Sequence, residues 1–326
     1  MMHEWILHLV DMVKEGKSIG REEARKILKL RQDCFHILLF AASELRKHFR
    51  GNSVKTCSIV NAKSGLCKED CKFCAQSARY KTNIDTYPLI SSEEIISTAE
   101  KEEGHSRRFG IVTAGRGLDK DEIETVKKAI DGFSEKNLKQ IPCASLGILD
   151  EDDFRMLKQA GLTRYHHNLE TSKNFYPSIC STHPYNERVK TIKAAKNAGL
   201  EICVGGIFGL GESLEDRIDL LCEIRELVPD SVPINFLIPI SGTPLEAIER
   251  ISLWEAVKVI ALARFIMPDT DIKLGAGRPE VFKDAQHLVF LAGANGMIVG
   301  DLLTIKGRKP EDDLAVVKDL GLRISQ

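Results

Sequence analysis

Short apolar runs alternate with longer amphipathic segments over most of the chain. We interpret eight of these runs as β-strands, at residues 57–60, 109–113, 141–144, 164–167, 201–204, 232–236, 271–274 and 296–299. The segments between them have helical periodicity and many begin at Ser, Asp or Thr caps, at residues 93–103, 119–136, 150–160, 184–198, 212–227, 253–266 and 279–292. Alternating strands and helices favour a parallel sheet, and eight such units predict an α/β fold of the closed (β/α)8 or TIM-barrel class.

The beginning of the chain has a different pattern. Helical segments at residues 3–14, 21–30 and 34–49 precede the first expected strand. No linker rich in Pro, Gly or Ser divides the remaining sequence. We therefore expect an N-terminal helical extension over residues 1–50, which covers the bottom or the side of the barrel, and a single barrel domain over residues 51–326.

The charge balance favours a small-molecule substrate. The 326 residues include 46 Lys and Arg and 47 Asp and Glu, so neither nucleic acid nor an acidic membrane surface is expected as a partner. No apolar run approaches the ~18 residues of a membrane span, and the first residues carry Glu4 and lack the basic region of a signal peptide. Nine cysteines without such a signal indicate a reducing compartment, and we expect a cytoplasmic protein.

Three closely spaced cysteines carry the strongest functional signal. Cys67, Cys71 and Cys74 form a C-x3-C-x2-C pattern with no fourth cysteine nearby. Structural zinc sites and ordinary iron–sulfur clusters use four protein ligands, so three thiolates leave one coordination position open for a small molecule. The charged residues between the cysteines indicate a polar loop and argue against a group of unrelated buried thiols, and zinc is a further alternative. The spacing, with an aromatic residue before the third cysteine, resembles the radical S-adenosylmethionine (radical SAM) enzymes.

The cysteine triplet directly follows the first expected strand, and active sites of TIM barrels form at the C-terminal ends of the strands. Several other unusual residues fall at inward or C-terminal strand positions: Cys57, Cys143, His167, Asn168, Glu170, Cys203, Asn235 and Arg278. Each alone has an ordinary structural explanation, since a strand cysteine often packs as a small apolar side chain. Together they predict a polar cavity, because a barrel interior is normally filled with branched apolar residues.

The chain resembles the biotin synthase family from about residue 17 to residue 322. The matching stretches are residues 64–77, 165–172, 205–212, 231–240, 275–278 and 292–295. The resemblance implies a radical SAM barrel that removes hydrogen from two unactivated carbon atoms of dethiobiotin and inserts one sulfur atom between them. It also implies a homodimer and an electron donor such as flavodoxin or ferredoxin.

The resemblance assigns roles to single residues. A [4Fe-4S] cluster on the cysteine triplet would bind SAM and supply the electron that cleaves it into methionine and a 5'-deoxyadenosyl radical. Phe73 would lie against the adenine, and Asn168 and Glu170 would bind the ribose. Gly205 and Gly206 would let the backbone approach the methionine part. The candidates around dethiobiotin or the sulfonium group are Asn168, Asn235 and Arg188.

The sulfur source is the second expected site. The resemblance implies an auxiliary [2Fe-2S] cluster that uses Cys143, Cys203 and Arg278, with a third cysteine on the second strand. Gly110 stands at that position and cannot bind iron. Cys57, on a neighbouring strand about 4.8 Å away, offers a replacement thiolate. We therefore expect an auxiliary cluster on Cys57, Cys143 and Cys203 with Arg278 adjacent, either [2Fe-2S] or larger; the alternative is a chain that has lost this cluster.

Three cysteines remain outside these two sets. Cys34 and Cys222 lie on apolar helical faces and are expected to pack in the core. Cys180 lies in the loop after the fourth expected strand, on the active face. Its role as a metal ligand or as a sulfur relay is therefore left open.

Two other functions are alternatives. The iron-hydrogenase maturases and methylornithine synthase share this type of barrel and triplet but need no auxiliary sulfur donor. A non-catalytic iron–sulfur carrier would need an exposed, labile cluster. The cysteines expected inside the barrel argue against both.

Overall fold

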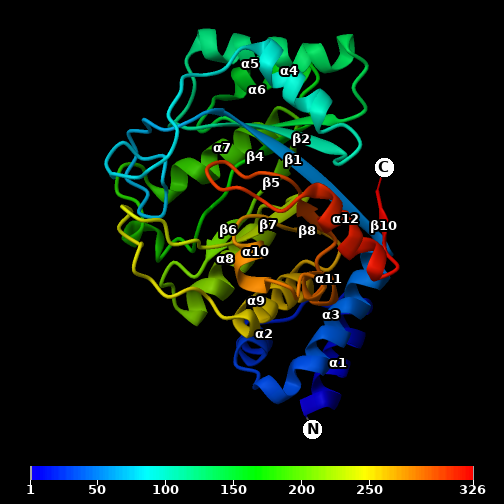
Figure 1. The fold of residues 1–326 in the computed structure, drawn as a ribbon. Coiled ribbons are helices and arrows are strands. Elements are labelled where there is room, and N and C mark those ends of the chain that lie inside the picture. The colour runs from blue at the N-terminus through cyan, green and yellow to red at the C-terminus, as the bar shows by residue number, and fades with distance from the viewer. Residues whose placement is uncertain (1, 326) are drawn as a thin grey trace.

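The computed structural model describes residues 2–325 and shows a closed barrel of parallel strands surrounded by helices (Figure 1). The wall follows the order β1-β2-β3-β4-β5-β7-β8-β9, and β9 pairs with β1 to close it. Both β5 and β6 pair with β7, so they form one interrupted strand. All eight strands expected from the sequence are present, which confirms the α/β-barrel fold. The strands are β1 (Ser53–Lys63), β2 (Arg108–Thr113), β3 (Ile141–Ser145), β4 (Arg164–His166), β5 (Glu201–Cys203), β6 (Gly206–Phe208), β7 (Ser231–Phe236), β8 (Asp271–Leu274) and β9 (Gly296–Ile298).

Helices follow the strands and cover the outside of the barrel. They are α4 (Ser92–Lys101), α5 (Lys120–Glu135), α6 (Glu151–Gln159), α7 (Tyr185–Asn197), α8 (Leu214–Glu226) and α9 (Leu253–Ile266). Four of them begin at a capping box, in which the N-cap side chain and a side chain three residues later each accept a backbone N–H. The N-cap residues of these four helices are Ser91, Asp119, Asp150 and Ser213.

The C-terminal third differs from the prediction in two places. The expected helix 279–292 is divided into α10 (Arg278–Phe282) and α11 (Leu288–Leu291), because Lys283 has a φ of 46°, which a right-handed helix excludes. The strand β10 (Arg323–Ile324) and the helix α12 (Pro310–Asp319) were not predicted, although Pro310 and the acidic residues that follow it are helix-start signals. β10 pairs with the start of β1 and extends the sheet at the closing seam.

The N-terminal extension lies at one end of the barrel (Figure 1). It consists of α1 (Met2–Lys14), α2 (Arg21–Leu28), the 3-10 turn η1 (Gln32–Cys34) and α3 (Phe35–Arg50). α2 and α3 pack against α9, and α2 also contacts α8. Arg50, the last residue of α3, forms an ion pair with Asp271, the first residue of β8. α3 therefore ends at the N-terminal side of the barrel, away from the strand ends where barrel active sites form.

A buried arginine links α9 to the base of the barrel. Arg264 donates hydrogen bonds of 2.8 Å to Asn295 Oδ1 and to the carbonyl oxygens of Gly293 and Thr270. Asn295 Oδ1 also accepts from the backbone N–H of Ile272 at 2.9 Å. The stretch around Asn295 thus stabilises the packing of the barrel base and lies apart from the expected active site.

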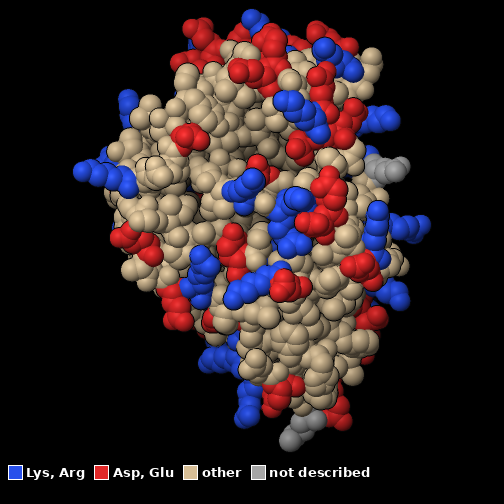
Figure 2. All heavy atoms as spheres, viewed as in Figure 1, with Lys and Arg blue, Asp and Glu red and all other residues tan. Residues whose placement is uncertain are grey.

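The surface carries charges of both signs. On the face shown in Figure 2, Lys and Arg side chains are interspersed with Asp and Glu, in keeping with a net charge of −1. Among residues 2–325, no helix is long and apolar enough to cross a lipid bilayer.

Candidate active site

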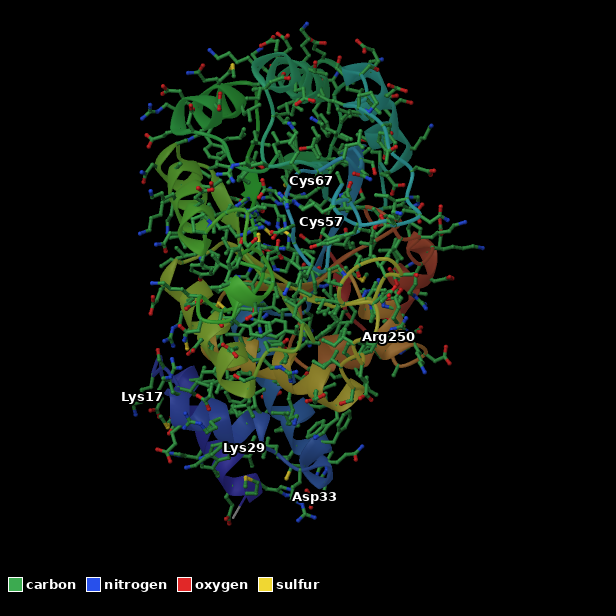
Figure 3. All side chains as sticks on the ribbon, turned by 90° about the vertical axis from the view of Figure 1, so that its left-hand side faces the viewer. Lys17, Lys29, Asp33, Cys57, Cys67 and Arg250 are labelled. Atoms are coloured by element: carbon green, nitrogen blue, oxygen red, sulfur yellow. The ribbon has the colours of Figure 1, made fainter. Side chains whose placement is uncertain are left out.

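One cavity occupies the C-terminal ends of the strands and continues into the barrel. Its volume is about 430 Å³, within the range of small-molecule sites. The cysteine triplet lines its outer part, and Cys57, Cys143 and Cys203 on the strands line its inner part. Figure 3 labels Cys57 and Cys67 and shows both near the middle of the molecule.

The cysteine triplet lies in the loop that follows β1. Cys67 closes this loop through two backbone hydrogen bonds, from its N–H to Gln76 O at 3.0 Å and from Ala78 N–H to its carbonyl oxygen at 2.7 Å. Gly65 and Leu66 turn the chain with φ angles of 75° and 55°. The loop therefore holds its thiols at the cavity by backbone bonds, without a helix or strand of its own.

A carboxylate ties the triplet loop to the loop after β4. Asp70 accepts hydrogen bonds from the backbone N–H groups of Ser181 at 2.9 Å and Thr182 at 3.1 Å. Burial alone would raise the pKa of Asp70, but these hydrogen bonds outweigh it and hold the pKa well below its usual value. The backbone N–H of Lys72 also donates to Ile179 O at 2.9 Å. These contacts fix the two loops against each other.

Asn168, Glu170 and Arg188 form a polar group beside the triplet. Arg188 donates to Glu170 Oε1 at 3.4 Å and to Asn168 O at 3.1 Å. Glu170 has a φ of 69°, a strained conformation of the kind that persists where the surroundings hold it. These three residues and Phe73 all line the cavity. The structure thus brings together the side chains that the resemblance assigns to SAM and its surroundings.

The other residues assigned by resemblance have visible structural partners. A Cβ on Gly205 would overlap the carbonyl oxygen of Pro233, so a glycine is required here for β5 and β7 to pack. Neither Gly205 nor Gly206 is among the described residues that line the cavity. Asn235 does line it, and its side chain accepts from the backbone N–H of Ala276 at 2.9 Å and donates to Gly206 O at 3.3 Å.

Two of the strand thiols contact cations that the sequence patterns did not single out. Lys273 Nζ on β8 donates to Cys57 Sγ on β1 at 3.3 Å, and Arg108 on β2 donates to Cys143 Sγ on β3 at 3.6 Å. Burial alone would lower the pKa of Lys273, but the neighbouring thiols reverse this and raise it. Arg108 lies two residues before Gly110 on one strand, and residues two apart share a face of a sheet. The two-residue spacing from Gly110 is the sequence signal that would have predicted Arg108 as a residue of the lumen.

The third strand thiol, Cys203 on β5, lies among the same positive charges. Burial raises the pKa of this thiol, but Lys273, His166 and Arg164 outweigh burial and lower it to about 6. In the strand ladders Arg164 pairs with Cys143, and His166 pairs with Cys203. Positive charge therefore favours the thiolate of Cys203, which is the form that binds metals, whereas burial outweighs Arg108 at Cys143 and raises the pKa of that thiol.

Arg278 is not brought to the strand thiols, so the expectation for this residue needs correction. Its guanidinium donates two hydrogen bonds to Asp313, at 3.0 Å and 2.5 Å, and one to Gln286 at 2.6 Å. Arg278 is not among the described residues that line the cavity. The buried carboxylate of Asp313, on helix α12, draws the arginine away from the lumen. Lys273 is the cation that lies beside Cys57 instead.

Gly110 faces the lumen, as expected for the position that lacks a cysteine. It pairs with Cys143 in the ladder between β2 and β3. A Cβ at this position would lie 3.0 Å from Cγ2 of Ile59, which is tighter than an ordinary contact. The glycine therefore leaves open space beside Cys143 while Ile59 occupies part of the neighbouring volume.

The spacing of the two thiol sets fits clusters better than single ions. Among residues 2–325, the one group of three or more His, Cys, Asp or Glu ligand atoms that all lie within 4.8 Å of one another is formed by Cys71, Cys180 and His183. Neither the cysteine triplet nor the strand set is so compact. In an iron–sulfur cluster the iron atoms are held by separate thiolates, so both sets suit a polynuclear group.

Two family models match the chain. Residues 63–223 match the radical SAM superfamily, and residues 233–323 match the biotin and thiamin synthesis associated domain. The chain is 46% identical over 325 residues to a biotin synthase of Pelobacter propionicus, with 99% of both chains covered. It is also 46% identical over 317 residues to a biotin synthase of Pelotomaculum thermopropionicum, with 97% of this chain and 98% of the relative covered.

Two solved structures share the fold at lower sequence identity. A methylornithine synthase superposes with a TM-score of 0.85 at 23% identity, over 98% of this chain and 97% of that one. A maturase of the [FeFe]-hydrogenase superposes with a TM-score of 0.83 at 18% identity, over 99% of this chain and 76% of that one. At these identities the likeness shows the fold alone. Because 46% identity to a biotin synthase extends over 99% of the chain, the protein belongs to the biotin synthase family of radical SAM enzymes.

Proposed function

We propose that the enzyme converts dethiobiotin to biotin by radical SAM sulfur insertion, with an auxiliary iron–sulfur cluster as the sulfur source. The observation that carries the proposal is that two sets of three cysteine thiols line one cavity, one in the loop after β1 and the other on the strands β1, β3 and β5. A substrate in a cavity of about 430 Å³ would face both sets at once. Hydrogen removal and sulfur transfer could then act on the same carbon atoms without release of the substrate.

The cysteine triplet would hold the [4Fe-4S] cluster and the strand set would hold the auxiliary cluster, either [2Fe-2S] or larger. When bound, the clusters and SAM supply the carbon radical that removes hydrogen and the sulfur atom that is inserted. The residues of the chain bind and orient these groups. Phe73 would cover the adenine, Asn168 and Glu170 would bind the ribose hydroxyls, and Arg188 donates to Glu170 at 3.4 Å.

Dethiobiotin would lie between the two thiol sets, next to Asn168 and Asn235. Asn168 Oδ1 already accepts from the backbone N–H of Gly205 at 3.1 Å, and its Nδ2 makes only a long contact of 3.4 Å to Glu170. The Nδ2 groups of the two asparagines are therefore the donors best placed to bind a ureido carbonyl oxygen. The oxygens of both side chains are held by backbone N–H groups, which fixes the orientation of the amides.

The buried strand thiols argue against the alternative functions. Cys57 is 9% exposed and Cys203 is 5% exposed, so a cluster on them could not be handed to an acceptor protein as a carrier requires. A maturase or a methylornithine synthase needs no second set of thiols, and the likeness to those proteins is one of fold. The partners we propose from the family resemblance are a flavodoxin or ferredoxin as electron donor and a second copy of the chain in a cytoplasmic homodimer.

A labelled single turnover tests the proposal. The enzyme is reconstituted anaerobically with iron and heavy-isotope sulfide, freed of excess sulfide, and given SAM, a low-potential reductant and dethiobiotin. We expect biotin that carries the heavy sulfur, detected by mass spectrometry, together with 5'-deoxyadenosine. Biotin without the label would place the sulfur source outside the reconstituted clusters. If every preparation with full iron content forms 5'-deoxyadenosine but no biotin, the result would favour another radical SAM reaction.

A further inference from the structure

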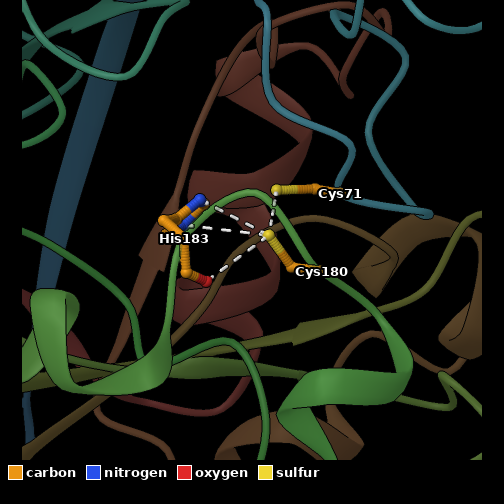
Figure 4. A group of neighbouring side chains, drawn as sticks. All are labelled: Cys71, Cys180 and His183. Carbon is orange, nitrogen blue, oxygen red and sulfur yellow. Dashed lines mark hydrogen bonds between the residues drawn. The ribbon is translucent and has the colours of Figure 1, made fainter.

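Cys71, Cys180 and His183 bring two sulfur atoms and an imidazole together beneath the triplet loop (Figure 4). Cys71 Sγ lies 3.8 Å from Cys180 Sγ, and Cys180 Sγ lies 3.4 Å from His183 Nδ1. The three side chains are buried, with exposures of 9%, 4% and 5%. Cys180 and His183 have no part in the proposed reaction, so this cluster of ligands has no role so far.

The distances match the edges of one tetrahedral metal site. Two thiolates about 2.3 Å from one zinc ion lie about 3.8 Å apart, and a thiolate and an imidazole nitrogen on the same ion lie about 3.5 Å apart. The iron atoms of a cluster need a thiolate each. Cys180 is therefore too close to Cys71 to act as a separate cluster ligand, and the pair fits a single ion. We propose that Cys71, Cys180 and His183 bind one zinc ion when the triplet carries no cluster.

The surroundings of His183 are those of a metal ligand. Its Nε2 lies 2.8 Å from the hydroxyl of Tyr176, which also accepts a hydrogen bond of 2.8 Å from Arg188 Nε. This partner fixes the orientation of the ring, and with Nε2–H donating to Tyr176 the Nδ1 atom would be left for the metal. Glu69 faces Nδ1 on the other side of the ring. Zinc would displace this carboxylate from Nδ1. Glu69 is not part of the group of ligand atoms that lie within 4.8 Å of one another, so the fourth coordination position is left to water.

The two loops that carry the ligands are preformed in the metal-free protein. Asp70 holds the backbone of Ser181 and Thr182, and Lys72 N–H holds Ile179 O at 2.9 Å, so both loops that carry the ligands are already fixed. A preformed site loses little conformational entropy on binding. Soft thiolate and imidazole ligands suit zinc, which binds more tightly than ferrous iron to such donors.

Zinc and the radical SAM cluster would compete, because both use the thiolate of Cys71. Zinc binding itself does not depend on the proposed function, whereas the competition depends on the role of Cys71 in the cluster. The consequence is that free zinc slows assembly of the [4Fe-4S] cluster. Cys180 and His183 would then act as the residues that keep the cluster-free loop in one conformation and protect Cys71 from oxidation.

The first experiment is a metal titration of the reduced, cluster-free, full-length protein. Co²⁺ serves as the spectroscopic probe for a tetrahedral site with thiolate ligands, and Zn²⁺ affinity is measured by competition with a chromophoric chelator. We expect one ion per chain in the wild type, and affinity lower by at least about tenfold in Cys180→Ser and His183→Gln. Cys67→Ser, Cys74→Ser and the control Cys222→Ser should bind as the wild type does.

The opposite pattern would overturn the proposal. If Cys67→Ser and Cys74→Ser lose the ion while Cys180→Ser keeps it, the metal sits on the triplet. Absence of tight binding by the wild type would overturn it equally. Circular dichroism of each variant shows whether a loss of zinc affinity reflects unfolding. His183→Asn is a second substitution at the same position and should lose affinity as His183→Gln does.

A second measurement separates this site from the proposed function. Wild-type protein loaded with Zn²⁺ should gain cluster absorbance more slowly during anaerobic reconstitution, and Cys180→Ser should lose this zinc sensitivity. Cluster-loaded Cys180→Ser is expected to cleave SAM, since Cys180 contacts neither SAM nor the strand thiols in the proposed reaction. Equal zinc sensitivity of wild type and Cys180→Ser would contradict the competition and leave the radical SAM assignment intact.

Discussion

Lys273 and Cys57 lie on strands that are not neighbours in the barrel wall, yet Nζ of the lysine is 3.3 Å from Sγ of the cysteine. Both side chains are buried. A buried ammonium group is costly unless a negative group lies next to it, and thiolates or an anionic cluster would supply that charge. The pair therefore marks the part of the lumen where negative charge is expected.

Replacement of Lys273 tests this electrostatic role. Lys273→Met should reduce the iron and sulfide retained by the strand set and shift the reduction potential of the remaining auxiliary cluster to more negative values, because loss of a nearby positive charge disfavours the reduced form. Lys273→Arg keeps the charge and should stay close to the wild-type potential. The measurements are iron and sulfide analysis and voltammetry, with exposed Lys190→Met as control. Unchanged iron content and potential in Lys273→Met would refute the role.

The triplet is tested by Cys71→Ala. Two remaining thiolates cannot hold a cubane with one open iron, so reductive SAM cleavage should be abolished. The yield of 5'-deoxyadenosine, measured by chromatography, is the readout. Cys34→Ala and Cys222→Ala are the controls, and each should cost about 1 kcal/mol of packing stability and leave the chemistry intact. Wild-type 5'-deoxyadenosine from Cys71→Ala would mean that the triplet does not hold the catalytic cluster.

Changes at Cys143 and Cys203 should separate radical formation from sulfur transfer. Either residue changed to Ala removes a thiolate of the strand set but leaves the triplet unaltered. Each variant should form 5'-deoxyadenosine in the presence of dethiobiotin and little or no biotin. Both products are measured in one reaction by mass spectrometry. Near wild-type biotin from both variants would place the sulfur source elsewhere, with Cys180 the first residue to examine.

Cys57→Ser tests whether this thiol replaces the missing ligand of strand β2. Serine keeps the volume but lacks the soft thiolate that iron prefers, so the auxiliary cluster should be depleted while SAM cleavage continues. Mössbauer spectra and iron counts provide the measurement. Full iron, full sulfide and full biotin formation would show that Cys57 is a packing residue.

The converse substitution adds Gly110→Cys to Cys57→Ser. The new side chain would face the lumen beside Cys143, and Ile59 would have to move by a few tenths of an ångström to admit its Cβ. We expect partial recovery of auxiliary iron. The same iron content as in Cys57→Ser alone would show that Ile59 blocks the position.

Asn295 is expected to contribute to stability without contributing to catalysis. Asn295→Ala removes the acceptor for Arg264 and the donor to Asp271, both buried, and should lower the free energy of unfolding by about 3 kcal/mol. Urea denaturation of the cluster-free protein measures this, with exposed Asn83→Ala as the control. SAM cleavage by the folded, reconstituted variant should match the wild type.

The barrel could be predicted from the sequence because its signals are local. Each strand is a short apolar run, and most of the outer helices begin with their own capping residues, such as Asp119, so these signals do not depend on distant partners. The helix expected at 279–292 is broken at Lys283, whose left-handed backbone no sequence pattern indicates. The short elements α12 and β10 owe their place to contacts with the rest of the barrel, such as the ion pair of Asp313 with Arg278.

The candidate site was predictable where residue type alone limits the chemistry. Cysteines are rare and bind iron, so Cys57, Cys143 and Cys203 stood out on their strands. Arginines and lysines are common on surfaces, so Arg108 and Lys273 did not stand out, although their strand positions place them in the lumen. The partner of a charged residue is a tertiary property, which is why the expectation for Arg278 was wrong.

The closure of the wall has a consequence for biosynthesis. β1 lies between β2 on one side and β9 with β10 on the other, so the strand that carries Cys57 is completed by segments near the opposite end of the sequence. A ribosome that adds about 5–20 residues per second delivers β9 roughly 11–44 s after the triplet. During that interval the thiols of the nascent chain have no closed wall around them. A cluster on the strand set would therefore be enclosed only after β9 has paired with β1.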